Sequence, residues 1–253
     1  MQHRGGSQMF FDEKIREGSE RNEMQELREK RDDYDDIKEI NVELVESVEG
    51  LEQQPMVVTG SPFEIAGSLD CTQGDNRYNV ASDCGLVSCS NYLKLCGIEV
   101  SEDEIVGYAL ANNLCSRGYF SAPESWGGTN DQNLETILEH YGVGSSVFHS
   151  DEKRGSIGGI ADAVECGHAV MIGVNAGCLW DDPNFVGDGR ANHQITVTGT
   201  IRNESGELAA LTVCDSGRSL GADSCRVVSV SDMQGFYAAI PGASAIISDR
   251  AVR

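Results

Sequence analysis

Segments with the apolar spacing of helices come first along this chain, and segments with the alternation of strands come after them. Helical spacing occurs over residues 82–97, 101–109 and 129–142, and extended runs follow from residue 169 onward. A regular alternation of helices and strands would instead indicate a parallel sheet. The observed order predicts an α+β fold in which the first helices pack on an antiparallel sheet.

The predicted helices have start and stop signals. Ser82 or Asp83 can cap the first helix, and Gly97 ends its apolar stripe. Ser101 and Glu104 fit a capping box for the second. These signals place the N-terminus of the first helix next to residue 84.

The extended runs predict an antiparallel sheet. Residues 169–174 form a continuous apolar run that suits a buried strand. Residues 193–201 alternate, and after a polar turn the run 208–214 returns, which predicts a hairpin. Residues 227–230 and 245–247 predict further strands.

The chain divides by composition near residue 55. Residues 1–52 hold 16 acidic and 8 basic residues and no cysteine, so residues 1–55 are predicted to be a charged helical or partly disordered arm. This arm could be a solvated leader, a propeptide, a translocation arm or a partner-docking helix. Residues 56–253 are predicted to form the folded domain.

The net charge excludes some classes of function. Lys and Arg number 19 against 41 Asp and Glu, giving −22, so a nucleic-acid partner is disfavoured. No apolar run is long enough for a membrane span, and the N-terminus lacks a secretory signal. The chain is therefore expected to be cytoplasmic in its producer or delivered without that signal. The 9 cysteines cannot all pair.

The sequence Asp83-Cys84-Gly85 stands where a loop becomes a helix. A thiol there lies in the positive field of the helix N-terminus, which favours the thiolate. Cys84 is therefore the candidate nucleophile, although small buried cysteines are also common. Cys89 and Cys96 fall on the apolar stripe of the same helix and are predicted core residues.

A base and a carboxylate occur at matching strand ends. His193 opens the first strand of the predicted hairpin, and Asp215 follows the second. Because antiparallel neighbours lie about 5 Å apart, Asp215 could orient His193 while His193 takes the thiol proton. His168 is the rival base, but no carboxylate stands at a matching strand end.

Two loops could complete the site. Gln73, eleven residues before Cys84, could form an oxyanion hole with the Cys84 backbone N–H. The Gly- and Asp-rich segment 175–192 could rim a cleft as a lid. The pair Gly158-Gly159 predicts a turn.

The Asp83-Cys84-Gly85 helix start, the buried strand, His193 and Asp215 together resemble the papain-like cysteine peptidases, over about residues 68–220. Within these, the pattern is similar to the bacterial branch that cleaves double-glycine leader peptides before bacteriocin export, and to papain-fold toxin and effector domains. Family members usually carry the oxyanion glutamine closer to the nucleophile than Gln73 is, which leaves Asn76 or Asn79 as substitutes.

This resemblance implies a cysteine peptidase that hydrolyses peptide bonds through a Cys84-His193-Asp215 triad and a thioester, with Gln73 at the oxyanion. It implies no metal and no organic cofactor. The expected partners are a protein or peptide substrate and, for a toxin, an immunity or inhibitor protein. The same triad could serve a glutamine deamidase or acyl transferase. A catalytically silent binding or scaffold protein is the third alternative.

Overall fold

The computed structural model describes residues 56–60, 62–117 and 125–252. The arm predicted for residues 1–55 lies outside this range. The α-helices of the described part are α2 (Pro62–Ile65), α3 (Cys84–Leu95), α4 (Glu102–Asn112), α5 (Asp131–His140), α6 (Ile157–Glu165), α7 (Ala176–Trp180) and α8 (Val230–Met233). Its strands are β1 (Val57–Thr59), β2 (Ser145–His149), β3 (Val170–Val174), β4 (His193–Arg202), β5 (Leu208–Cys214), β6 (Arg226–Ser229) and β7 (Ser244–Ser248).

The strands form one antiparallel sheet. Its order is β2-β7-β3-β4-β5-β6, and β1 pairs with the far end of β4. The hairpin of β4 and β5 pairs Thr196 with Cys214, next to Asp215. On the other side of β4, His193 is opposite Val174 of β3. The start of β4 and the end of β5 therefore lie next to each other, at the same end of these two strands.

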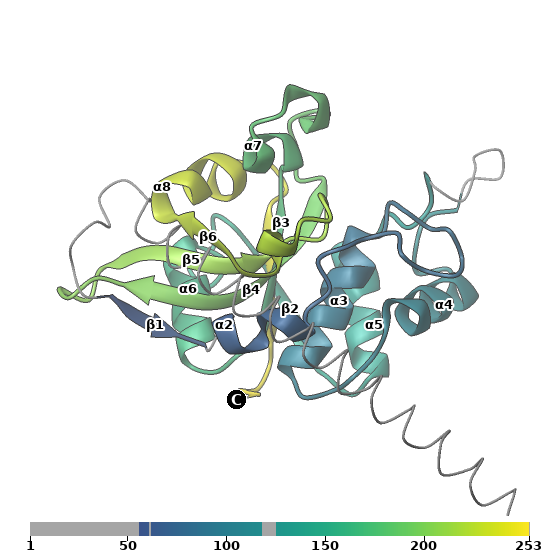
Figure 1. The fold of residues 1–253 in the computed structure, drawn as a ribbon, viewed down its shortest axis with the longest axis horizontal. Coiled ribbons are helices and arrows are strands. Elements are labelled where there is room, and N and C mark those ends of the chain that lie inside the picture. Colours follow the sequence, from purple (N-terminus) through teal and green to yellow (C-terminus); the bar gives the residue numbers. More distant parts are fainter. Residues whose placement is uncertain (1–55, 61, 118–124, 253) are drawn as a thin grey trace, which may run out of the picture.

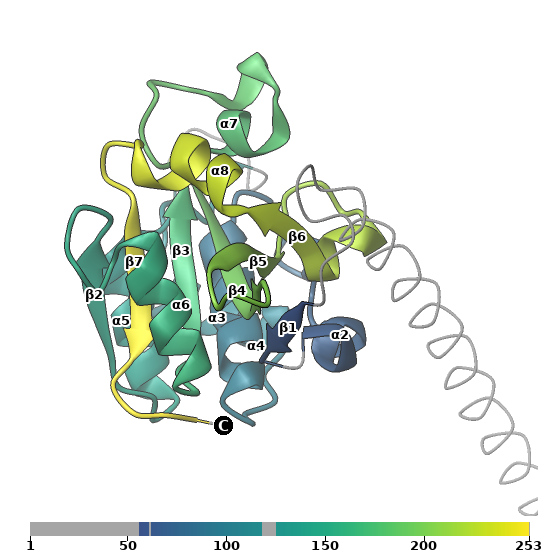
Figure 2. The ribbon, with the colours of Figure 1, turned by 90° about the vertical axis from the view of Figure 1, so that its left-hand side faces the viewer.

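Helices cover both faces of the sheet (Figures 1 and 2). On one face, α3, α4 and α5 share a core with Met171 and Ile246. On the other, α6 and the turns around Phe236 share a core with Ile172 and Val197. Because β3 is buried on both faces, its sequence is continuously apolar instead of alternating.

The α+β fold class predicted from the sequence is confirmed, with the first helices packed on an antiparallel sheet. Helix α3 begins at Cys84 with Asp83 as its N-cap residue. Ser101 and Glu104 form the expected capping box of α4. All the predicted strands are present, within one or two residues of their expected bounds.

One prediction is wrong, and two strands, β1 and β2, were not anticipated. Gly158-Gly159 lies in the first turn of α6 and is not an isolated turn. Ser156 caps this helix by accepting from Gly159 N–H, and buried Ile160 and Val164 hold it against the sheet. Burial of this face outweighs the low helix propensity of glycine. Of the strands that were not anticipated, β2 is an outer strand of the sheet and pairs with β7, and β1 pairs with β4.

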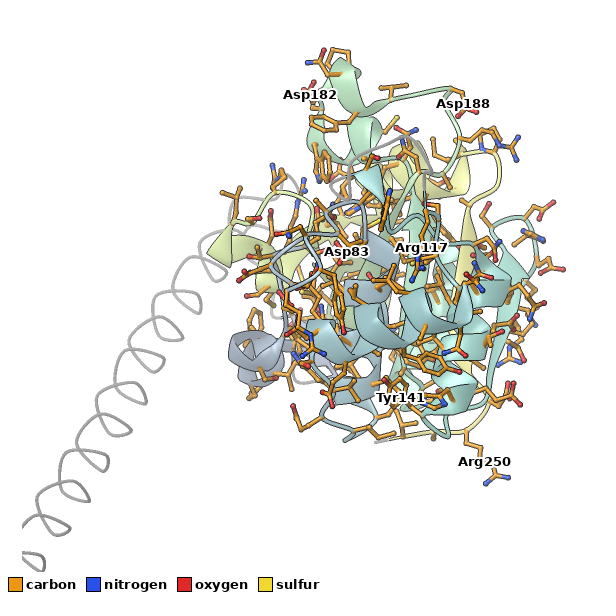
Figure 3. The ribbon with its side chains drawn as sticks, turned by 90° about the vertical axis from the view of Figure 1, so that its right-hand side faces the viewer. Asp83, Arg117, Tyr141, Asp182, Asp188 and Arg250 are labelled. Carbon is orange, nitrogen blue, oxygen red and sulfur yellow. The ribbon has the colours of Figure 1, made fainter. Side chains whose placement is uncertain are left out.

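The segment between β3 and β4 extends beyond the helices and the sheet. It contains α7, and Figure 3 shows Asp182 and Asp188 at its outer part. Asn175 fixes its base, because its side-chain amide donates to the carbonyl oxygens of Val186 and Arg190. No helix in the described ranges is long and apolar enough to cross a membrane.

Candidate active site

Helix α3 presents Cys84 at its first position. The N–H groups of a first helical turn have no partner within the helix, so they favour a negative charge there. Gly85 allows this turn to pack closely, since a Cβ at this position would lie 2.2 Å from Thr129 Oγ1. Cys84 is half-buried and is one of the residues that line a cleft.

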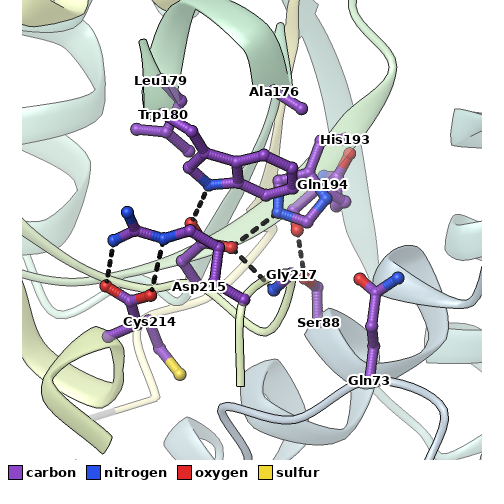
Figure 4. Close-up of polar contacts among 12 residues, drawn as sticks. Gln73, Ser88, Ala176, Leu179, Trp180, His193, Gln194, Cys214, Asp215 and Gly217 are labelled. Atoms are coloured by element: carbon purple, nitrogen blue, oxygen red, sulfur yellow. Dashed lines mark hydrogen bonds and ion pairs between the residues drawn. The ribbon is translucent and has the colours of Figure 1, made fainter. Parts of the chain in front are cut away.

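His193 and Asp215 form a buried pair where β4 begins and β5 ends. His193 Nε2 lies 2.7 Å from Asp215 Oδ1, and the two side chains are 4% and 0% exposed (Figure 4). Since Nε2 is engaged by Asp215, Nδ1 is the ring nitrogen left for the Cys84 thiol, which lies within hydrogen-bonding reach of the imidazole. The fold thus brings together three side chains that are far apart in the sequence.

Trp180 of α7 holds the second oxygen of the carboxylate, and sequence reasoning missed it. Its Nε1–H donates to Asp215 Oδ2 at 2.7 Å, and its ring lies 5.0 Å from the imidazole of His193. Gly217 N–H donates to Asp215 Oδ1 at 2.9 Å. A Cβ on Gly217 would lie 2.3 Å from the Trp180 ring, so this position needs glycine.

The three groups shift one another's pKa. Burial opposes charge on His193, but the Cys84 thiolate and the Asp215 carboxylate outweigh it and raise the pKa of His193 to about 10. Burial would raise the pKa of Cys84, but His193 and the backbone N–H groups of Gln194 and Gly85 hold it below its ordinary value. The favoured state is a thiolate beside an imidazolium.

The carboxylate is charged over a wide pH range. Burial would raise the pKa of Asp215, but its bonds with His193, Trp180 and Gly217 lower it to about 2. Arg226 Nη1 lies 4.0 Å from Asp215 Oδ2 and adds a second positive charge nearby. Asp215 therefore stabilises a positive imidazole.

Hydrogen bonds of Ser88 join α3 to β4 beside the site. Ser88, one turn after Cys84, donates from Oγ to the Gln194 carbonyl at 3.0 Å. Gln194 follows His193 in the strand. This contact fixes the helix that bears the thiol against the strand that bears the imidazole.

The glutamine predicted for the oxyanion lies in the adjacent loop. Gln73 Nε2 donates to Ala81 O at 2.8 Å, its Oε1 is buried without a hydrogen-bond partner, and its backbone N–H donates to Ser216 O at 3.0 Å. In Figure 4 its amide end points to the side of His193 and Gln194. One Nε2 hydrogen is taken by Ala81, and the second is left for a ligand.

The alternative oxyanion donors, Asn76 and Asn79, and the rival base, His168, have other surroundings. The Asn76 side-chain amide donates to Val80 O at 2.7 Å within the protein, and Asn79 is exposed in a left-handed conformation. His168 Nδ1 pairs with Ser248 O at 2.6 Å. His168 precedes β3, whereas His193 is opposite the last residue of that strand, so His168 lies at the other end.

A cleft of about 410 Å³ opens beside the thiol and the imidazole. Its lining includes small residues and amide side chains, among them Gly128, Gly173, Asn130, Asn192 and Gln194. Gln194 Nε2 is buried and has no hydrogen-bond partner. Asn192 brings the end of the predicted lid segment to this cleft. Amides and backbone groups of this kind can bind the polar main chain of a peptide.

The described residues contain no cluster of three or more His, Cys, Asp or Glu side chains placed to hold a metal ion. All 9 cysteines are free. Cys89 is buried in the core shared by α3, α4 and α5, as predicted. Cys96 is half-buried and packs against the same core.

Fold and site together define an α+β protein with a helix-terminal cysteine beside a buried His–Asp pair. No protein-family model matches the chain. It is 28% identical over 167 residues to uncharacterized proteins of Mycobacterium tuberculosis (Rv1268c) and Mycobacterium bovis (Mb1299c), covering 58% of this chain and 69% of each relative.

Two solved structures are similar to this chain. One is a double glycine motif protease from an AMS/PCAT transporter in complex with its leader peptide, at 13% identity and a TM-score of 0.39, covering 66% of this chain and 85% of that chain. The other is a putative C39-like peptidase from Bacillus anthracis, at 15% identity and a TM-score of 0.45, covering 67% and 90%.

Proposed function

We propose that this chain is a papain-like cysteine hydrolase that cleaves peptide bonds. The observation that carries the proposal is the position of the half-buried Cys84, which lines the cleft beside the buried His193–Asp215 pair. A structural cysteine does not need an imidazole whose far nitrogen is bound to a carboxylate. That arrangement fits a nucleophile with its own general base.

In the proposed reaction the Cys84 thiolate attacks the amide carbonyl carbon and forms a C–S bond. The resulting oxyanion accepts hydrogen bonds from the Cys84 backbone N–H and from Gln73. His193 gives its Nδ1 proton to the leaving nitrogen, and the C–N bond breaks to leave a thioester. His193 then takes a proton from water, which attacks the thioester and releases the acid and the thiolate. Asp215 keeps the imidazole oriented and stabilises its charge.

The substrate proposed is a peptide or an extended protein segment. The amide groups of Asn130 and Gln194 in the cleft suit the polar groups of a main chain, and Gln194 Nε2 has no partner within the protein. The chain's charge of −22 favours basic substrates as a steering effect. Delivery as an effector and an immunity partner stay predictions from the sequence.

The first test is alkylation by iodoacetamide against pH, resolved by peptide. Cys166 and Cys178 are exposed and serve as internal references for ordinary accessible thiols. We expect Cys84 to react well below the ordinary thiol pKa of about 8.5, and this reactivity to disappear in His193→Ala. A Cys84 that reacts only at the pH of the reference thiols would overturn the proposal.

The second test uses a peptide library with Cys84→Ala as the control. Peptides that wild type cleaves and Cys84→Ala does not would support a peptidase. A mass increase of about one dalton at glutamine without cleavage would identify the same nucleophile as a deamidase, and would replace the peptidase proposal.

A further inference from the structure

Directly behind Cys84 lies a pair of carboxyl groups with no role in the proposed reaction. Asp83 is 0% exposed and Glu102, at the start of α4, is 6% exposed. Their side chains lie within hydrogen-bonding reach of each other. Two ionised carboxylates have no hydrogen to share, and burying both charges together is costly. A proton held between them would remove one of these charges and supply the missing hydrogen.

Asp83 stands at the N-cap position of α3, but its side chain does not cap the helix. It is the N-cap residue of α3, where an aspartate normally accepts from the N–H groups of the first turn. Here its side chain makes no capping bond and is directed to Asn76 and Glu102. A capping carboxylate would compete with the Cys84 thiolate for the helix N-terminus, and this arrangement avoids that competition.

The hydrogen bonds indicate which partner carries the proton. Glu102 Oε1 accepts from Asn76 Nδ2 at 2.8 Å and from Gly74 N–H at 3.0 Å, and these donors favour a negative charge on Glu102. Asp83 Oδ2 accepts from Asn76 Nδ2 at 3.2 Å, whereas Asp83 Oδ1 is buried without a donor. A protonated Asp83 that donates to Glu102 satisfies both groups.

The pair also fixes the loop that bears the proposed oxyanion donor. Glu102 binds the backbone of Gly74, the residue after Gln73. Asn76 links both carboxyls to Val80 O. The loop is thereby attached to α4 on one side and to the residue before Cys84 on the other.

We propose that Asp83 and Glu102 share one proton and act as positioning residues for the reaction at Cys84, by fixing the Gln73 loop against the start of α3. This inference rests on the proposed function for its catalytic part. Proton sharing itself is independent of any activity.

The surrounding charges favour the protonated pair. Burial and the neighbouring Glu102 raise the pKa of Asp83 to about 8, with a further contribution from Cys84. Burial likewise raises the pKa of Glu102, and Asp70 adds to this. Burial and the nearby Asp83 raise the pKa of the Cys115 thiol, and the positive charge of Arg117 acts in the opposite direction. A thiolate and a carboxylate nearby both disfavour a second negative charge.

The sign of the pH effect on stability follows from linkage. A carboxyl whose pKa is raised from 3.8 to about 8 contributes fully below pH 3.8, and that contribution falls as the pH rises through about 8. Asp83→Asn keeps the shape, stays neutral and donates from its amide to Glu102. We expect this variant to be more stable than wild type in urea unfolding at pH 8, with the difference closing toward pH 4.

The control is Glu99→Gln, which removes one carboxylate at an exposed position three residues before Glu102. We expect its stability to follow the wild-type pH dependence. If wild type and Asp83→Asn show parallel stability from pH 4 to 8, no proton is shared and the inference is wrong. Glu102→Gln provides a second variant, expected to flatten the same pH dependence.

The catalytic part is tested by peptide cleavage against pH, using a peptide identified with the library. We expect wild-type kcat to fall above about pH 8 as the pair ionises, and Asp83→Asn to retain kcat to higher pH with KM unchanged. Equal profiles would show that the pair does not position the site. If Cys84 is unreactive to iodoacetamide at low pH while the stability difference persists, the proposed function fails and proton sharing stands.

Discussion

Replacement of Trp180 by Phe tests how the site holds its carboxylate. Phe keeps an aromatic ring beside His193, loses part of the packing of the larger indole, and removes the Nε1–H that donates to Asp215 Oδ2 at 2.7 Å. A hydrogen bond to a charged acceptor contributes about 1.5–3 kcal/mol. Without it, Arg226 Nη1 still lies 4.0 Å from that oxygen. We expect the free energy of unfolding at pH 7 to fall by about 2 kcal/mol.

The pH dependence separates this bond from lost packing. The pKa of Asp215 is lowered from 3.8 to about 2, so its contribution to stability is present above pH 3.8 and is lost as the pH falls through about 2. The difference between wild type and Trp180→Phe should therefore shrink between pH 4 and pH 2. What remains at low pH is the packing of the larger ring.

The assay is urea unfolding followed by far-ultraviolet circular dichroism, because the variant loses one of the 2 tryptophans and fluorescence would not be comparable. Asp215→Asn completes a double-mutant cycle. We expect a coupling energy of about 1 kcal/mol or more. A loss at pH 7 below about 0.5 kcal/mol, or one that is the same at pH 7 and pH 3, would refute the reasoning.

Three further substitutions probe the same assembly. Ser88→Ala removes the bond to the Gln194 carbonyl and should cost about 1 kcal/mol in urea unfolding, with slower alkylation of Cys84; unchanged alkylation would mean that the bond does not align the site. Gly217→Ala places a Cβ against the Trp180 ring and should cost about 1–3 kcal/mol; a fully stable variant would show that the ring moves freely. Asp215→Asn should lower kcat by about 100-fold or more, measured on a library-derived peptide, and activity equal to wild type would remove Asp215 from the mechanism.

The core of the candidate site could be predicted because its parts follow local rules. The alternation after His193 and the polar turn before residue 208 specify a hairpin, and a hairpin brings its outer ends together. Asp83-Cys84-Gly85 precedes a clear apolar stripe, so the thiol was placed at a helix start. Each of these patterns lies within a single helix or a single hairpin.

The contacts made by Trp180 and Glu102 could not be predicted in this way. Trp180 lies in a segment rich in Gly and Asp, 35 residues before its partner Asp215, and no periodicity relates the two. Asp83 has the sequence pattern of an ordinary cap, and only the packing of α4 beside α3 brings Glu102 to it. Helix α6 was missed because two glycines hide a helix that is stabilised by burial.

The position of strand β7 has a consequence for the order in which the sheet is completed. It follows every other described strand in the chain, yet it lies between β2 and β3 in the sheet. During synthesis the sheet therefore has a gap until residues 244–248 have left the ribosome, since a strand cannot pair before it emerges. Nascent chains that already contain Cys84, His193 and Asp215 would still lack a closed scaffold behind them. The sheet that carries His193 and precedes Asp215 is therefore complete only after residues 244–248 have been synthesised.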